Sequence, residues 1–282
     1  MNAASNTPCM FPLSRHSGSE TRMLLRCGLL FVGIFLSVTL LNAKILKTRN
    51  VRTTYGARLP LTIGLALEYQ ADSEESEYGF PFYTEWAFSD ALQLSIEPNY
   101  ARIHSKTGGS VNGWGDIETC LIYEILPETR RRPAFAVEGL IKWPTTNDQR
   151  RSSGEMDYTI GGIVSKELGP VDLDANVDYT FVGSPSGVRL KNRIEISLSA
   201  EWHLSPTLDI EGELVGSSGG FSGKPGTIGG SVGTPEQTNS LEGVIGLAER
   251  LGRHLKLEEG IVVVSDGSWQ AVIAWEWAFS GE

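Results

Sequence analysis

Apolar and polar residues alternate along most of the chain after residue 58, in twelve stretches of about ten residues. Across residues 171–181, every second position from Val171 to Phe181 is apolar, and the positions between them are Asp, Asn or Thr. Residues 61–70 show a similar alternation. Because successive side chains of a β-strand point to opposite faces of its sheet, each stretch predicts a strand with one apolar and one polar face.

The repetition of this pattern predicts an all-β fold, a single antiparallel transmembrane β-barrel of about 12 strands. One alternating segment is a weak signal, whereas a dozen in succession without a helical pattern are typical of such barrels. A sheet can cross hydrocarbon only when closed, since every backbone polar group must be paired. We expect strands at residues 59–70, 78–88, 91–103, 115–126, 133–143, 156–167, 171–182, 192–204, 207–215, 240–250, 255–264 and 268–279.

The connections between these strands alternate in length. Short turns are expected at residues 89–90, 169–170, 205–206 and 251–254, and long loops at 71–77, 104–114, 144–155, 183–191 and 216–239. Outer-membrane barrels have short periplasmic turns and longer extracellular loops. The alternation therefore predicts that both ends of the barrel chain lie in the periplasm.

The N-terminal region has the pattern of a secretory signal peptide. An apolar run at residues 29–41 follows Arg22 and Arg26 and precedes Ala43. We expect residues 1–43 to be an extension and signal peptide, with Met23 as a more ordinary start; a single anchor helix is the alternative. Residues 44–58 are then a periplasmic segment, 59–279 the barrel and 280–282 a C-terminal tail.

Charge and cysteine content narrow the function. The chain has a formal net charge of −10, and without residues 1–43 it keeps 21 basic and 33 acidic residues. Nucleic acid is not an expected partner, because a phosphate backbone requires a basic surface. Without residues 1–43 only Cys120 is left, which excludes an internal disulfide. No metal-ligand spacing or nucleotide motif is apparent, so no cofactor, metal or catalytic residue is predicted.

The two faces of the strands predict two sets of functional positions. An aromatic girdle is expected on the lipid side, where such residues mark membrane interfaces: Phe80, Phe82, Trp86, Tyr179, Phe181, Trp202, Trp275, Trp277 and Phe279. The lumen is expected to receive a mainly acidic set: Glu68, Glu97, Glu118, Glu138, Asp172, Asp174, Asp178, Arg193, Glu195, Glu211 and Glu213.

These acidic positions favour a channel or transporter for small solutes with a cation-preferring lumen. The alternative is an occluded barrel in which the charges cross-link one another, because twelve strands lie between small filled barrels and large open ones. A purely structural or adhesive barrel, working through its outer loops, is a further alternative.

An outer-membrane lipid hydrolase is the alternative from a different class. Such an enzyme needs a serine within hydrogen-bond reach of a histidine base. His203 and Ser205 form the only candidate dyad, and their position at a turn makes a solvated pair the better interpretation. His104 adjoins Ser105 on the opposite face, and His254 has no nearby serine.

Several segments resemble a known family in their order and spacing. They are residues 92–98, 115–118, 134–145, 157–170 and 179–183. They resemble the transporter-like outer-membrane family called "MetA-pathway of phenol degradation". The resemblance implies an outer-membrane channel for aromatic or other hydrophobic compounds and carries over no catalytic residue. One departure is Pro144-Thr145-Thr146, where the family tends to have Pro-Thr-Gly.

Together these features predict a Gram-negative outer-membrane protein exported through its signal peptide. Its expected partners are outer-membrane lipids, the barrel-assembly machinery and a small-molecule solute whose identity the pattern does not give.

Replacing Val177 with Asp tests the assignment of the faces. A charge on the lipid face at mid-membrane depth costs on the order of 2 kcal/mol, so this variant is expected to insert and fold poorly. Folding is read from the heat-dependent mobility of the barrel on gels. A variant that assembles like wild type would contradict the assignment.

Overall fold

The computed structural model describes residues 46, 48–50, 61–71, 75–106, 108–146, 152–186, 190–221 and 237–279. All of them belong to the second of the chain's two structural units, Leu41–Glu282. The expected signal peptide at residues 1–43 and the tail at 280–282 lie outside these ranges. Within them, no helix is long and apolar enough to cross a membrane.

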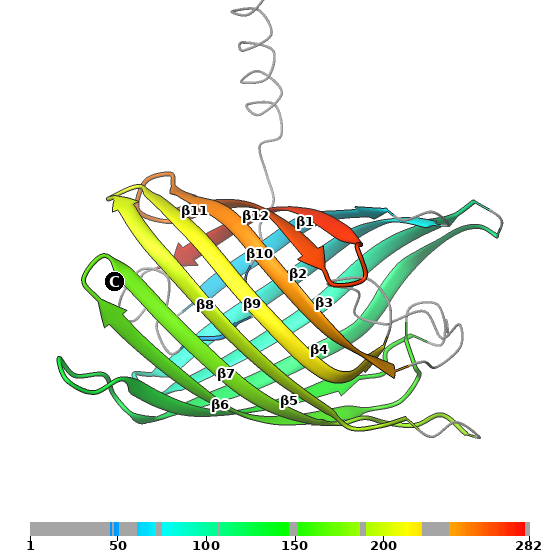
Figure 1. Cartoon of the computed structure of the whole chain (residues 1–282), viewed down its shortest axis with the longest axis horizontal. Helices are drawn as coiled ribbons and strands as arrows, with labels where there is room; N and C mark the ends of the chain where they lie inside the picture. The colour runs from blue at the N-terminus through cyan, green and yellow to red at the C-terminus, as the bar shows by residue number, and fades with distance from the viewer. Residues whose placement is uncertain are drawn as a thin grey trace, which may run out of the picture. The chain divides into compact units, whose positions relative to one another are not determined.

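Twelve strands form one antiparallel sheet that closes on itself (Figure 1). Each strand pairs with its neighbours in sequence, and the last strand pairs with the first. The strands are β1 (Leu61–Ala71), β2 (Glu75–Ser89), β3 (Leu92–Ser105), β4 (Gly109–Leu126), β5 (Ala134–Trp143), β6 (Asp157–Leu168), β7 (Val171–Phe181), β8 (Arg193–Ser205), β9 (Leu208–Phe221), β10 (Gln237–Arg250), β11 (Leu255–Val264) and β12 (Trp269–Phe279).

The pairing of β1 with β12 closes the barrel. Its register runs without a shift from Leu61 opposite Phe279 to Gln70 opposite Gln270. A closed sheet has no edge strand, so the backbone polar groups along these two strands are paired within the barrel wall. The predicted fold class, an antiparallel barrel of about 12 strands, is confirmed.

The strands extend further than the sequence pattern predicted at the end with long connections. The segment 104–114 was expected to be a loop, but β3 continues to Ser105 and β4 already begins at Gly109. Gly109, with a φ of 77°, lies opposite Ser105 beside the turn. The expected loops 71–77 and 216–239 are likewise shortened by β2, β9 and β10. The strands remain paired there although apolar and polar residues no longer alternate, because both faces of the sheet accept polar side chains beyond the apolar belt.

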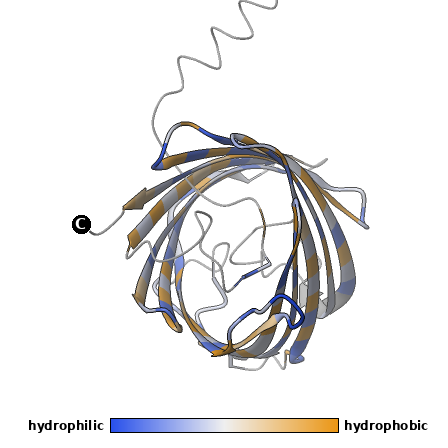
Figure 2. Ribbon diagram, turned by 90° about the vertical axis from the view of Figure 1, so that its left-hand side faces the viewer, coloured by the Kyte–Doolittle hydropathy of each residue, from blue (hydrophilic) through white to orange (hydrophobic). Residues whose placement is uncertain are grey.

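One face of the sheet is exposed and apolar, and the enclosed lumen face is buried and polar. Figure 2 shows hydrophobic and hydrophilic residues alternating along the strands around the barrel. In β7, the predicted lipid-facing residue Val177 is 55% exposed, whereas its neighbour Asn176 is 2% exposed. Phe181 and Trp202 are also exposed.

Aromatic contacts on the outer face join neighbouring strands. Phe82 and Trp114 have ring centroids 5.9 Å apart, and Trp114 meets Tyr100 at 5.4 Å in an edge arrangement. Trp114 is 55% exposed. Trp114 falls in the segment expected to be a loop, and its position in β4 adds an aromatic residue beside the predicted Phe80 and Phe82.

Part of the lumen is filled by apolar packing. Ala66, Val244, Val262, Val272 and Ala274 form a buried cluster from β1, β10, β11 and β12, against which Leu46 and Tyr83 pack. The Tyr83 ring lies over Gly64 on the neighbouring strand, where an added Cβ would overlap the ring. The Tyr83 hydroxyl donates a hydrogen bond to Glu276. Because Gly64 has no side chain, the Tyr83 ring can lie over β1 on the lumen face.

Gly64→Ala is expected to destabilise the barrel, because the methyl group forces the Tyr83 ring out of its place. Overpacking of this kind costs about 1 to 3 kcal/mol. Urea unfolding of the barrel in lipid vesicles measures the effect. Gly139→Ala is the matched control, since an added Cβ at Gly139 meets nothing within 4 Å. Equal stability of both variants would show that Tyr83 does not need the space.

Candidate functional site: the charged lumen

The predicted lumen residues all lie on strands of the barrel wall. Glu138, Glu211 and Glu213 are buried. The other members are half-buried: Glu68, Glu97, Glu118, Asp172, Asp174, Asp178, Arg193 and Glu195. They do not form one continuous acidic wall. Instead, the structure divides the charged side chains into networks, several of them built around one cation.

A segment before the first strand provides the first of these cations. The Arg49 guanidinium lies 2.9 Å from Glu97 on β3 and 3.3 Å from Glu138 on β5. Ser95 donates a hydrogen bond of 2.8 Å to Glu97, and the Cys120 thiol donates one of 3.4 Å to Glu138. Arg49 thus pairs with two carboxylates on strands that are separated only by β4.

The backbone of the same segment is also bound by lumen side chains. With its amide oriented to satisfy both atoms, Asn176 on β7 donates to the Arg49 carbonyl at 2.9 Å and accepts from the Arg49 N–H at 3.0 Å. The Thr48 N–H and hydroxyl both donate to Glu213 on β9. Thr48 is 1% exposed.

These contacts place residues 48 and 49 across the lumen. Arg49 reaches β3 and Thr48 reaches β9, and these two strands are on opposite sides of the ring of twelve. Two adjacent residues that contact opposite walls must lie between them. Residues 48–49 therefore narrow the interior of the barrel.

Lys256 on β11 is the centre of a second network. Its ammonium lies 2.8 Å from Glu211 and 2.7 Å from Glu258. All three side chains are at most 4% exposed. Glu211 and Glu258 share this one buried ammonium. Its positive charge offsets the repulsion between the two carboxylates.

Lys142 on β5 holds a third network near the end of the barrel with long connections. The Lys142 ammonium lies 3.0 Å from Asp157 and 3.3 Å from Asp116. Ser152 donates a 2.6 Å hydrogen bond to the fully buried Asp116. These contacts tie the strand β6 and the residues before it to β4 and β5.

A fourth network lies near the end of the barrel with tight turns. The two ring nitrogens of His203 on β8 lie 2.8 Å from Asp209 and 3.3 Å from Asp172. Arg250 on β10 lies 2.6 Å from the second oxygen of Asp209 and 3.5 Å from Glu201. The lumen is therefore charged from one end to the other, and each network joins at least two strands.

The wall also carries a cavity of about 560 Å³ between β5 and β8. Its lining combines Glu138 and Asp178 from the lumen face with apolar residues of the outer face, such as Ile160 and Val177. Gly161 also lines the cavity and lies opposite both Glu138 and Asp178 in the sheet. Any Cβ at Gly161 would overlap the Asp178 carboxylate.

The predicted His203 and Ser205 dyad is not formed. Both ring nitrogens of His203 face carboxylates, and the Ser205 hydroxyl lies 3.4 Å from that of Thr207. His104 does contact a serine, Ser110, at 2.8 Å on an exposed hairpin. His104 and Ser110 are both exposed to solvent. The predicted dyad at His203 and Ser205 therefore gives no support to a hydrolase.

Sequence reasoning missed Arg49, Thr48 and Tyr83 as lumen residues. Residues 44–58 carry no strand pattern, and nothing in their composition signals contact with the barrel interior. Tyr83 could have been found by parity, because it directly follows Phe82, which the pattern directs to the lipid side.

Solved structures with a similar fold include a channel and two porins. The COG4313 outer membrane channel from Pseudomonas putida F1 matches with a TM-score of 0.60 and 13% identity, over 80% of this chain and 98% of that one. The NanC porin has a TM-score of 0.56 at 10% identity, covering 77% and 98% of the two chains. The KdgM porin has a TM-score of 0.51 at 8% identity, covering 77% and 99%.

At these identities the likeness shows a shared barrel fold. No protein-family model matches the chain, and no curated protein matches it. Membership of the phenol-degradation family therefore stays a prediction.

Lys256→Met is expected to destabilise the barrel by about 3 to 5 kcal/mol, because it leaves Glu211 and Glu258 buried without their shared cation. Urea unfolding measures the loss. Adding Glu211→Gln and Glu258→Gln is expected to restore stability.

The matched control is Lys166→Met, which removes a more exposed ion pair with Glu128. An exposed pair contributes about 1 kcal/mol or less. If Lys256→Met is no more harmful than this control, the buried network does not stabilise the barrel.

Proposed function

We propose that this protein is an outer-membrane channel for small solutes, with an acidic lumen that favours cations and is narrowed by residues 48–49. The bridge that these two residues make between β3 and β9 carries the proposal. An exposed apolar belt around a closed barrel suits a membrane, and a polar charged interior suits passage of water-soluble solutes. The similar folds of an outer membrane channel and two porins agree with it.

The same proposal includes export to the outer membrane of a Gram-negative cell through the expected signal peptide. The exposed apolar faces of β7 and β8, including Val177, Ile196 and Leu198, supply the lipid contact. A solute must pass Arg49 and its partners Glu97 and Glu138, because residues 48–49 lie across the lumen. Cations are favoured there when Arg49 withdraws, since two carboxylates are then uncovered.

The lumen chemistry bears on the solute. The side chains around residues 48–49 are carboxylates, an amide, a hydroxyl and a thiol. Such a lining favours small cationic or polar solutes over aromatic ones. Aromatic or hydrophobic compounds, which the family resemblance implies, are the alternative solute class.

Planar-bilayer recording of the purified barrel in a KCl gradient tests this function. Wild type is expected to show small conductance steps with a cation-selective reversal potential. A Thr48→Ala, Arg49→Ala variant is expected to conduct more and to be more cation-selective, because the bridge is lost and Glu97 and Glu138 are uncovered.

Arg131→Ala is the matched control, because Arg131 is exposed in a turn outside the strands. An anion-selective reversal potential would overturn the acidic lumen. Identical conductance of the double variant and wild type would overturn the role of residues 48–49.

A further inference from the structure

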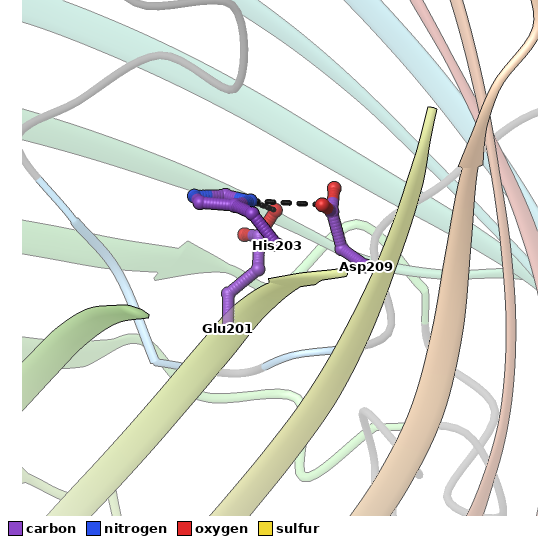
Figure 3. Close-up of side chains that lie close together, drawn as sticks. All are labelled: Glu201, His203 and Asp209. Atoms are coloured by element: carbon purple, nitrogen blue, oxygen red, sulfur yellow. Dashed lines mark hydrogen bonds and ion pairs between the residues drawn. The ribbon is translucent and has the colours of Figure 1, made fainter. Parts of the chain in front are cut away.

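Four side chains that can bind metals meet in the lumen beside the tight turn between β8 and β9. Figure 3 shows Glu201 and His203 from β8 and Asp209 from β9 turned toward one another. One ligand atom from each of these three residues lies within 4.8 Å of the other two. The fourth side chain, Asp172 on β7, approaches the far ring nitrogen of His203. Three neighbouring strands thus supply the cluster.

The separations between ligand atoms suit a small metal ion. His203 Nδ1 lies 2.8 Å from Asp209 Oδ1 and 3.8 Å from Glu201 Oε1. Zinc bonds to nitrogen and oxygen of about 2.0 to 2.2 Å in tetrahedral geometry put ligand atoms roughly 3.4 Å apart. The two measured separations lie on either side of that value. Small side-chain rotations would therefore bring all three atoms to bonding distance.

The second nitrogen of His203 has the partner that metal-bound histidines have. Nε2 lies 3.3 Å from Asp172 Oδ2. A metal-ligating histidine donates its other ring N–H to a carboxylate or carbonyl, and this fixes the ring and raises its basicity as a ligand. Asp172 can accept that bond while Nδ1 faces Glu201 and Asp209. This contact distinguishes the cluster from a simple group of acidic residues.

Nearby cations leave room for the metal. Arg250 lies 2.6 Å from Asp209 Oδ2, so Oδ1 of the same carboxylate is the atom that turns to His203. Glu201 lies 3.5 Å from Arg250 and 4.0 Å from Lys256. Lys256 itself makes its short contacts with Glu211 and Glu258. Glu201 is thus the ligand most able to move toward an ion.

We propose that Glu201, His203 and Asp209 form a binding site for a divalent transition metal, with Zn²⁺ as its best fit. One imidazole and two carboxylates form a ligand set that zinc accepts. Together with Asp172, the two carboxylates supply the negative charge that the ion would share with Arg250. Three protein ligands leave a fourth position for water on the lumen side, where His203 is 29% exposed. The bound ion links β8 to β9 and adds positive charge beside Arg250 at this end of the lumen.

Isothermal titration of the untagged, detergent-purified full chain with ZnCl₂ tests the site. Wild type is expected to bind one Zn²⁺ per chain. His203→Gln and Asp209→Asn are each expected to abolish this binding. Asp172→Asn is expected to weaken it by about 10-fold to 100-fold, as loss of a supporting carboxylate does.

His254→Gln is the matched control, because His254 lies at the same end of the barrel and bonds the Ala278 carbonyl instead of a carboxylate. This variant is expected to bind Zn²⁺ like wild type. Copper substituted for zinc is expected to show coupling to one imidazole nitrogen in electron paramagnetic resonance, and to lose it in His203→Gln.

Two results would overturn the proposal. One is the absence of saturable Zn²⁺ binding to folded wild type. The other is binding that His203→Gln and Asp209→Asn leave unchanged while both variants fold. The site does not depend on the channel function, because binding is measured without conductance.

Discussion

The structure depends on the closure of one sheet by the pairing of β1 with β12. In a membrane no water is present to bond an open edge, so the whole ring must form for any strand to be stable there. Closure also creates an enclosed face that belongs to all twelve strands. Apolar residues of the alternating pattern then face lipid, and the acidic residues between them are forced together inside. The charges of the lumen are a consequence of how the wall is built.

The enclosed carboxylates must be compensated within the barrel, and few cations do it. Lys142, Arg250 and Lys256 come from the wall, whereas Arg49 comes from the segment before β1. The ion pairs of Arg49 with Glu97 and Glu138 favour a position of that segment inside the barrel. The contacts of Arg49 with Glu97 and Glu138 therefore both narrow the lumen and neutralise part of its charge. Movement of Arg49 would change pore width and selectivity together.

The sequence predicted the wall well and the interior only in outline. Strands such as 171–181 follow from a period of two in the sequence. That period also separates the residues that face lipid from those that face the lumen. The hairpin at residues 104–114 was missed, because paired backbone beyond an apolar belt needs no alternation. The contact of Arg49 with Glu97 joins residues 48 positions apart through space inside the ring. Local pattern cannot encode such a contact, and neither can it show that His203 meets Asp209 across a turn.

The accessibility of the Cys120 thiol tests most directly whether residues 48–49 fill the lumen. In a Cys9→Ser, Cys27→Ser background Cys120 is the only thiol of the chain, and its side chain is buried beside Glu138. Its rate of modification by a charged methanethiosulfonate is measured with and without Thr48→Ala, Arg49→Ala. The account predicts slow modification when Thr48 and Arg49 are present and much faster modification when both are replaced. Equal rates in the two barrels would contradict it.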